Sequence, residues 1–359
     1  MATLRLVPIG DWIHHRLIAF LIAAYALAAF APEVGLRIRS TEVSGPIPGV
    51  PGLAVSFPSI LLSLLLFNAG LGVEPTRLRG LFRRSRMLCV GLAANLLIPL
   101  GFILAVSIGM SLWHNSGEVQ SILVGLALIA SMPVAGSSTA WSQNTDGDMA
   151  LSIGLVLGST VLSPLTTPAV LHSAGWLAEG DFATRLHELA AGGTSRFLVA
   201  CVLLPSLAGI ATRCLIGSAS HARLRPSMKL INSVVLLILC YSNAAAVLPG
   251  TVANPDWDFL GVMLAIVLGL CVLGFAVGAA IARCSGADPG QRASLMFGLG
   301  MTNNGTGLVL ATTSLLQVPD VMLPVIFYNL IQHLVAGAAA RWVLPDTIAK
   351  AGELAAGES

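Results

Sequence analysis

The chain has 359 residues, of which 55% are apolar and only 10% are charged. Water-soluble globular domains carry about a quarter charged residues, so this composition excludes that class and indicates an integral membrane protein. The formal net charge of +2 does not indicate a nucleic-acid partner, because the basic residues fall in loops between apolar segments.

Ten apolar segments are each long enough to cross the hydrocarbon core of a bilayer as a helix, which takes about 20 residues. Their approximate bounds are 14–31, 53–73, 86–109, 119–143, 149–172, 195–216, 228–248, 257–282, 292–316 and 321–344. We therefore expect an all-α, multi-pass membrane protein with ten transmembrane helices, forming a single unit over residues 1–359 with the lipid bilayer as its surroundings.

The first segment closes on small residues at positions 26–31, a pattern that also precedes signal-peptide cleavage sites. Cleavage there would leave nine segments and place the termini on opposite sides of the membrane. We interpret the first segment as a retained helix, with a signal peptide as the alternative.

The basic residues are divided unequally between the two sides of the membrane. With both termini cytoplasmic, 15 of the 19 Lys and Arg residues fall on the inner side and 4 on the outer side. Cytoplasmic loops are enriched in these residues, so we predict cytoplasmic termini and a bacterial-type inner membrane location.

Two polar breaks interrupt the apolar segments, one in each half of the chain. They lie at residues 137–144 and 300–307 and are rich in hydroxyl, amide and Gly residues. Irregular backbone at membrane depth is tolerated only where it is buried in protein or lines a wet cavity. Paired breaks in corresponding halves indicate the binding site of a secondary transporter.

The ten segments divide into two sets of five, over about 14–172 and 195–344, with a break in the fourth segment of each set. Because five is odd, the second set must be inserted upside down relative to the first. A weaker similarity between the two halves is that Asn68 of the second segment corresponds to Asn243 of the seventh. These features predict an inverted repeat.

Several motifs carry a resemblance to a known family. They are Phe-Asn-Ala-Gly-Leu at 67–71, Ser-Met-Pro at 131–133, Gly-Asp-Met-Ala-Leu-Ser at 147–152, Ser-Pro-Leu-Thr-Thr-Pro at 163–168 and Gly-Met-Thr-Asn-Asn-Gly at 300–305. Together they resemble the bile acid:sodium symporter family, in its bacterial ten-helix form. The resemblance implies a panel of segments 1, 2, 6 and 7 and a core of segments 3–5 and 8–10, with segments 4 and 9 unwound where they cross. It also implies an alternating-access symporter of an organic anion or small carboxylate, driven by sodium.

Unwound helices expose backbone N–H groups at the positive end of a helix dipole. An anionic ligand can bind there even where no Arg or Lys side chain is present. We expect the substrate at the backbone of Gly136, Ser137 and Ser138, with hydrogen bonds from Asn303 and Asn304. The alternative is that these residues cap the helix breaks or join helices.

Sodium sites follow from the resemblance alone, and no other cofactor is expected. By position they fall on Ser138, Thr139 and Ser152, and on Met301 and Thr302.

Four positions depart from the family pattern. Val156 lacks a ligand oxygen, and Gly298 replaces a glutamate. Thr302 and Ala94 each replace a glutamine, with Asn95 beside Ala94 as a substitute. The predicted sodium sites are therefore degenerate, and we expect a weak sodium dependence with at most one coupled ion.

His333 offers a second way to couple transport. It shares one helical face with Asn329 and Gln332, and a histidine can carry a proton. The alternatives are therefore a sodium-independent or proton-coupled carrier, and a transport-derived receptor without turnover.

An enzyme is not expected. Ser138 and His333 would be the residues of an intramembrane hydrolase, but the sequence has no GxSxG or HExxH motif. A channel would need a continuous polar lining, and an arsenite exporter a thiol in the fourth segment. The oligomeric state cannot be read from the sequence.

Overall fold

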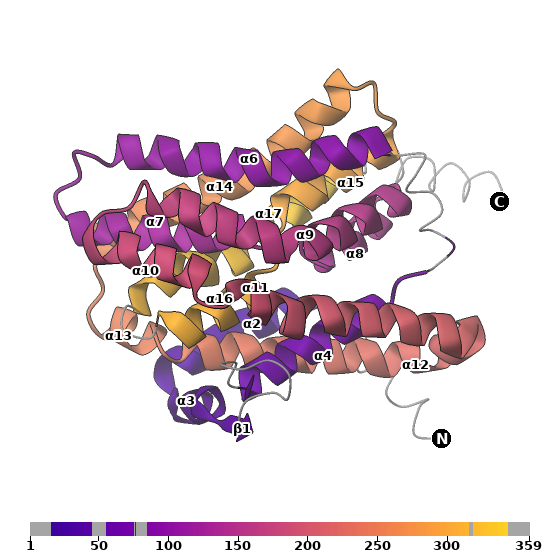
Figure 1. Ribbon diagram of the computed structural model, residues 1–359, viewed down its shortest axis with the longest axis horizontal. Coiled ribbons are helices and arrows are strands. Elements are labelled where there is room, and N and C mark those ends of the chain that lie inside the picture. The colour runs from indigo at the N-terminus through magenta and orange to yellow at the C-terminus, as the bar shows by residue number, and fades with distance from the viewer. Residues whose placement is uncertain (1–15, 45–54, 75, 77–84, 316–318, 344–359) are drawn as a thin grey trace, which may run out of the picture.

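The computed structural model describes residues 16–44, 55–74, 76, 85–315 and 319–343, and the fold is almost entirely helical (Figure 1). The helices are α2 (Leu17–Phe30), α3 (Glu33–Ser40), α4 (Phe57–Leu71), α6 (Ser85–Gly109), α7 (Ser116–Ser131), α8 (Ser137–Asn144), α9 (Met149–Gly175), α10 (Gly180–Ala191), α11 (Thr194–Leu198), η2 (Val199–Leu203), α12 (Leu204–Ala244), α13 (Leu248–Ala253), α14 (Trp257–Cys284), α15 (Pro289–Gly300), α16 (Asn304–Ser314), η3 (Pro319–Met322) and α17 (Leu323–Val343). A two-stranded antiparallel ribbon pairs β1 (Glu42–Ser44) with β2 (Val55–Ser56).

Six helices of the described chain are long and apolar enough to cross a membrane, and a seventh results if the bent pair α2 and α3 is one span. The helix α12 counts twice, because it is divided at Gly217, whose positive φ of 71° takes the backbone out of the helical region. The remaining expected segments, at about 53–73, 119–143 and 292–316, contain shorter helices.

A helix is interrupted near each polar break, but the first interruption lies at residues 132–136 and not at the predicted 137–144, which form the helix α8. The helix α7 ends before Pro133, which disfavours helical backbone at Met132 and has no N–H of its own. Helix α8 resumes at Ser137. In the second half α15 ends at Gly300, and α16 begins after Asn303, whose side-chain oxygen accepts a hydrogen bond from the N–H of Thr306.

The helices form two groups, which Figure 1 shows in its lower and upper parts: α2, α3, α4 and α12 below, and α6, α7, α9, α14, α15 and α17 above. Glycines bring α4 and α12 together, because Gly70 lies against the Ser206 carbonyl and Gly209 against the Phe67 carbonyl, with no room for a Cβ. In the upper group, Gly274 provides the close approach of α14 to α15.

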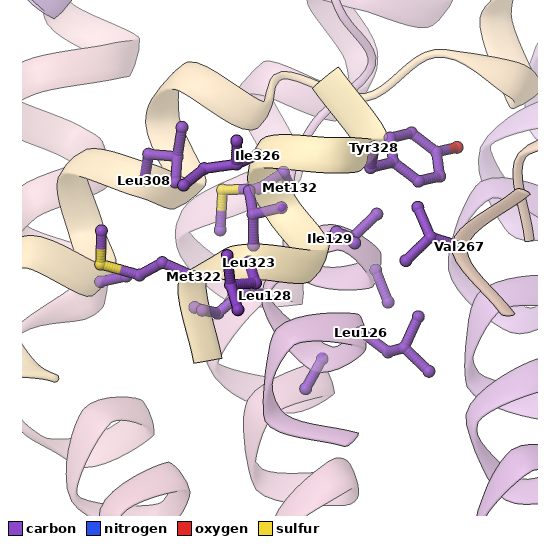
Figure 2. Close-up of a cluster of buried hydrophobic side chains, with 14 of the residues drawn as sticks. Leu126, Leu128, Ile129, Met132, Val267, Leu308, Met322, Leu323, Ile326 and Tyr328 are labelled. Carbon is purple, nitrogen blue, oxygen red and sulfur yellow. The ribbon is translucent and has the colours of Figure 1, made fainter. Parts of the chain in front are cut away.

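A buried apolar cluster fills the upper group around helix α7 (Figure 2). Leu126 and Ile129 of α7 lie there with Val267 of α14, Leu308 of α16 and Ile326 of α17, and all five are buried. Because lipid chains are as apolar as these side chains, close van der Waals packing rather than removal from water stabilises such a cluster within a bilayer. This cluster holds the two broken helices against unbroken ones.

Candidate functional site

The two breaks cross each other and satisfy each other's backbone. Val134 and Thr302 form an isolated antiparallel bridge. On either side of it the N–H of Ala135 donates to the Met301 carbonyl at 3.0 Å, and the N–H of Asn303 donates to the Pro133 carbonyl at 2.8 Å. Unpaired backbone groups at membrane depth cost several kcal/mol each, so this exchange explains how the helices unwind.

Side chains from two other helices complete the crossing. Ser159 of α9 accepts a hydrogen bond from the N–H of Val134 at 3.0 Å, and Gln332 of α17 accepts one from the N–H of Thr302 at 3.0 Å. Ser159 was missed by sequence reasoning, since a hydroxyl in a membrane helix usually bonds to its own backbone. Gln332 was noticed only as a member of a polar face.

A cavity of about 500 Å³ lies beside the crossing and is lined by α4, α8, α9 and α12. Of the residues expected to bind substrate, Gly136 and Asn303 line this cavity. Thr139 and Val156, named for the sodium sites, also line it. Ser138 and Asn304 are buried outside its lining, at 0% and 1% exposure.

The backbone N–H groups at the start of α8 differ in their availability. The N–H of Ser138 donates to the Ala135 carbonyl at 3.0 Å, and that of Thr139 to the Gly136 carbonyl at 3.3 Å. Within the described chain, the N–H groups of Gly136 and Ser137 make no such bond. Of these two residues Gly136 lines the cavity, whereas Ser137 lies outside the lining.

The two neighbouring asparagines of the second break are placed differently. Asn303 caps α16 with its side-chain oxygen and lines the cavity. Asn304 is turned inward, where its Nδ2 donates to the Thr302 carbonyl and its Oδ1 accepts from the Thr302 hydroxyl, both at 3.2 Å. The structure brings Asn303, but not Asn304, to the cavity beside Gly136.

Four buried hydroxyls have no hydrogen-bond partner among the residues described: Ser138, Ser142, Ser152 and Thr306. We call the three of them that lie on α8 and α9, namely Ser138, Ser142 and Ser152, the hydroxyl cluster. Ser138 and Ser142 lie one turn apart on α8, and Ser152 lies in the first turn of α9, which packs against α8. Ser142 was not singled out from the sequence, although its spacing of four from Ser138 puts both on one helical face.

The other residues named for sodium have internal partners. The Thr139 hydroxyl donates to the Gly136 carbonyl at 2.7 Å, and the Met301 carbonyl accepts from Ala135. Thr302 lines a second, much smaller cavity of about 20 Å³ with Ala94 and Asn95. That volume is enough for about one water-sized particle.

Leu155 occupies the space beside Gly298. A Cβ built on Gly298 would lie 2.6 Å from the Leu155 Cδ1 atom, and Leu155 is fully buried. The apolar side chain of Leu155 therefore fills the volume that a longer residue at position 298 would need.

The polar face of α17 forms a chain of hydrogen bonds. Asn329 donates to the Tyr25 hydroxyl at 2.9 Å and to the Cys240 sulfur at 3.4 Å. Gln332 donates to Asn329 at 3.3 Å and accepts from the N–H of Thr302. His333 is 5% exposed on the same helix. This chain links α2 and α12 to the crossing.

Basic residues also line the cavity, which sequence reasoning did not foresee. They are Arg213, Arg225 and Lys229 of α12. His221, which lies between Arg213 and Arg225 in the sequence, and the acidic residue Glu74 also line the cavity. All three cations had been counted only as evidence of membrane orientation.

Sequence comparison with known proteins identifies the family to which the chain belongs. A family model described as the sodium bile acid symporter family matches residues 59–250. An uncharacterized sodium-dependent transporter, YocS of Bacillus subtilis (strain 168), is 24% identical over 263 residues, covering 72% of this chain and 74% of that protein. The human ileal sodium/bile acid cotransporter is 26% identical over 249 residues, covering 68% of this chain and 66% of that protein.

The expected resemblance is therefore confirmed, as is the expectation that the protein is not an enzyme. The family model covers more than half of the chain, and the proteins named above are transporters. The chain belongs to the sodium bile acid symporter family, and it is a membrane transporter.

Proposed function

We propose that the protein is a secondary active symporter that carries an organic anion or small carboxylate across the membrane by alternating access, coupled to sodium. The observation that supports this most directly is the cavity of about 500 Å³ beside the crossing, with Gly136 and Asn303 in its lining. Cavities at paired helix breaks are where secondary transporters bind their substrates.

The anion would be held at the start of α8. The N–H groups of Gly136 and Ser137 carry the partial positive charge of a helix N-terminus, which favours a carboxylate by about 0.3–1 kcal/mol or more where water is excluded. Asn303 adds its side-chain N–H₂ group, because only its oxygen is used in capping α16. Ser138 and Asn304 would support this site from behind rather than touch the anion.

Sodium would be held by the hydroxyl cluster. Burying a hydroxyl without a partner costs about 1–3 kcal/mol, so three such groups close together indicate a missing partner. A hard cation with oxygen ligands fits that need. Ser138, Ser142 and Ser152 would supply side-chain oxygens, and neighbouring carbonyls the rest of the shell.

The proposed architecture is ten membrane-spanning helices in two inverted repeats, over about 14–172 and 195–344. The panel would contain α2, α4 and both parts of α12, which pack against each other. The core would contain the crossing helices with α6, α9, α14 and α17. We further propose cytoplasmic termini and a bacterial-type inner membrane location, on the basis of the basic residues.

In that orientation the conformation is open to the inside. The cavity reaches Glu74 at the end of α4, on the proposed cytoplasmic side. Asn329 joins Tyr25 and Cys240 on the proposed outer side, so panel and core are closed there.

Counterflow in proteoliposomes tests the proposal. Purified full-length protein is loaded with an unlabelled small carboxylate, and uptake of the labelled compound is followed in sodium and in choline, with empty liposomes as the control. We expect saturable exchange that sodium accelerates. Exchange driven by a pH gradient and indifferent to sodium would favour coupling through His333, and binding without exchange would favour a receptor.

A further inference from the structure

Three cations of α12 line the cavity at a distance from the helix breaks. They are Arg213, Arg225 and Lys229, which we call the basic cluster. The anion site proposed above, at Gly136 and Asn303, lies in the lining of the same cavity. A single carboxylate bound at the breaks would leave the basic cluster facing an empty part of the cavity.

The distance between these two places follows from how α4 and α12 pack. The two helices run side by side in the same direction, since Ser63 bonds to the Cys201 carbonyl and Gly209 lies between the Phe67 carbonyl and the Leu71 nitrogen, at the level of Ala69. Gly136 approaches Ala69, and Arg213 lies four residues after Gly209. At 1.5 Å per residue these four steps separate the Gly136 amide from the level of Arg213 by about 6 Å along the helix.

Arg213 is the most buried member of the basic cluster. Its side chain is 6% exposed, and its Nε atom has no hydrogen-bond partner among the residues that the structure describes. A buried, incompletely bonded guanidinium is costly unless an anion neutralises it. The five N–H donors of a guanidinium match a carboxylate or a phosphate in two parallel hydrogen bonds.

Among the described residues that line the cavity, positive charges outnumber negative ones. Glu74 is the one carboxylate among the described residues of the lining, against three cations. Arg213, Arg225 and Glu74 all act electrostatically on His221, so they share one region of the cavity. The carbonyl end of α4 supplies only about half a negative charge, so an excess of positive charge remains.

From these observations we infer that the transported substrate is a dianion, with one anionic group at the Gly136 and Ser137 amides and a second, about 6 Å along the cavity, at Arg213 and its basic neighbours. The inference rests on the proposed function, which requires only the first group. It narrows the substrate class to molecules with two separated negative groups.

The test compares diacids with monoacids of equal chain length. Dissociation constants of adipate and suberate, and of hexanoate and octanoate, are measured by calorimetry on full-length protein in nanodiscs, at fixed sodium and neutral pH. We expect at least one diacid to bind about tenfold or more tightly than its monoacid, as one added charge-assisted contact implies. Arg213→Gln should weaken that diacid at least about tenfold more than the monoacid.

The matched control is Arg223→Gln, which removes an arginine of the same helix that is exposed and lies outside the cavity lining. It should retain the full diacid preference, and Arg213→Lys should retain most of it. If Arg213→Gln does not give a monodisperse protein, Arg225→Gln carries the same comparison.

A wild-type protein without diacid preference overturns the inference, as does a preference that survives both glutamine variants. Monoacid binding and counterflow would then persist, so the proposed function would stand. If neither class of acid binds to the wild type or exchanges, the proposed anion site itself is wrong.

Discussion

Asn303 and Asn304 are adjacent in the sequence, yet only Asn303 faces the cavity. Its oxygen caps α16 and its N–H₂ group is directed to the lining, whereas both ends of the Asn304 amide bond to Thr302. Substitutions at position 303 can therefore separate capping from anion binding.

Asn303→Asp keeps an oxygen that caps α16 as well as the amide does, but adds a negative charge to the cavity. We expect an unchanged melting temperature and a loss of anion affinity of about tenfold or more, because like charges repel strongly where water is excluded. Asn303→Ser also keeps a cap and should lose affinity more mildly. A lower melting temperature with unchanged affinity for a monocarboxylate would assign Asn303 a structural role only.

The hydroxyl cluster makes a prediction about stability with and without sodium. Ser152→Ala removes a buried hydroxyl that has no partner in the described chain. In choline the melting temperature should stay equal or rise, whereas the stabilisation by sodium should disappear. Ser163→Ala is the control on the same helix, because that buried hydroxyl donates to the Thr160 carbonyl at 2.9 Å. An equal sodium response in wild type and Ser152→Ala would rule Ser152 out as a ligand.

Gly298 and Leu155 compete for one space. Gly298→Glu alone should destabilise the protein, since overpacking a core costs about 1–3 kcal/mol. Leu155→Ala alone should also destabilise it, by about 2–5 kcal/mol, because it leaves a cavity. The double variant should be more stable than the sum of the two changes predicts, and it should bind sodium more tightly than either single variant. Additive losses in melting temperature would show that the two sites are independent.

At the scale of elements, the broken helices are stable because other helices complete them. Two backbone hydrogen bonds join the breaks, from Ala135 to Met301 and from Asn303 to Pro133. Ser159 and Gln332 accept from the amides of Val134 and Thr302. Helix α17 connects this centre to α2 and α12 through Asn329. That connection is the contact that must open when the proposed panel and core separate on the outer side.

Asn329→Leu should make this opening more frequent, because it removes two hydrogen bonds at similar side-chain volume. Two bonds at a net value of about 1 kcal/mol each correspond to a rise of about thirtyfold in the open population. The measurement is the rate at which an impermeant maleimide labels Cys240, 3% exposed, in a variant whose other cysteines are replaced. The control is a second variant that keeps Cys201 instead of Cys240 as its reporter. Cys201 is 6% exposed and lies in η2, and its labelling rate should not change. A Cys240 rate equal to wild type would contradict the proposed outer closure.

At the scale of the whole molecule, one sodium ion is the expected stoichiometry. The hydroxyl cluster offers neutral oxygens for one ion, whereas the second region is reduced to a cavity of about 20 Å³ lined mostly by apolar side chains. Two cations near each other in a low-dielectric interior need a fixed negative charge, and position 298 holds a glycine. Uptake at fixed potential and pH should rise with sodium with a Hill coefficient near one. A coefficient near two would mean that a second site forms elsewhere.

The sequence alone determines the membrane class, the apolar segments and the position of the second break, whereas the first break lies at residues 132–136, just before the polar segment that predicted it. These properties are local: segment length reflects the thickness of the hydrocarbon, and Pro133, Gly300 and the capping Asn303 end or begin helices through their own backbone chemistry. The family motifs are short and contiguous for the same reason, so the family was recognisable without a structure.

Only the tertiary structure decides which polar groups are used. It directs Asn303 rather than Asn304 to the cavity and leaves Ser142 without a hydrogen-bond partner among the described residues. It also fills the space at Gly298 with Leu155 and brings Arg213 into the lining of the same cavity as Asn303. Each of these outcomes depends on the rotation and depth of one helix against another distant in sequence. Periodicity within a single helix does not contain that information, since in an apolar chain nearly every face is suited to burial.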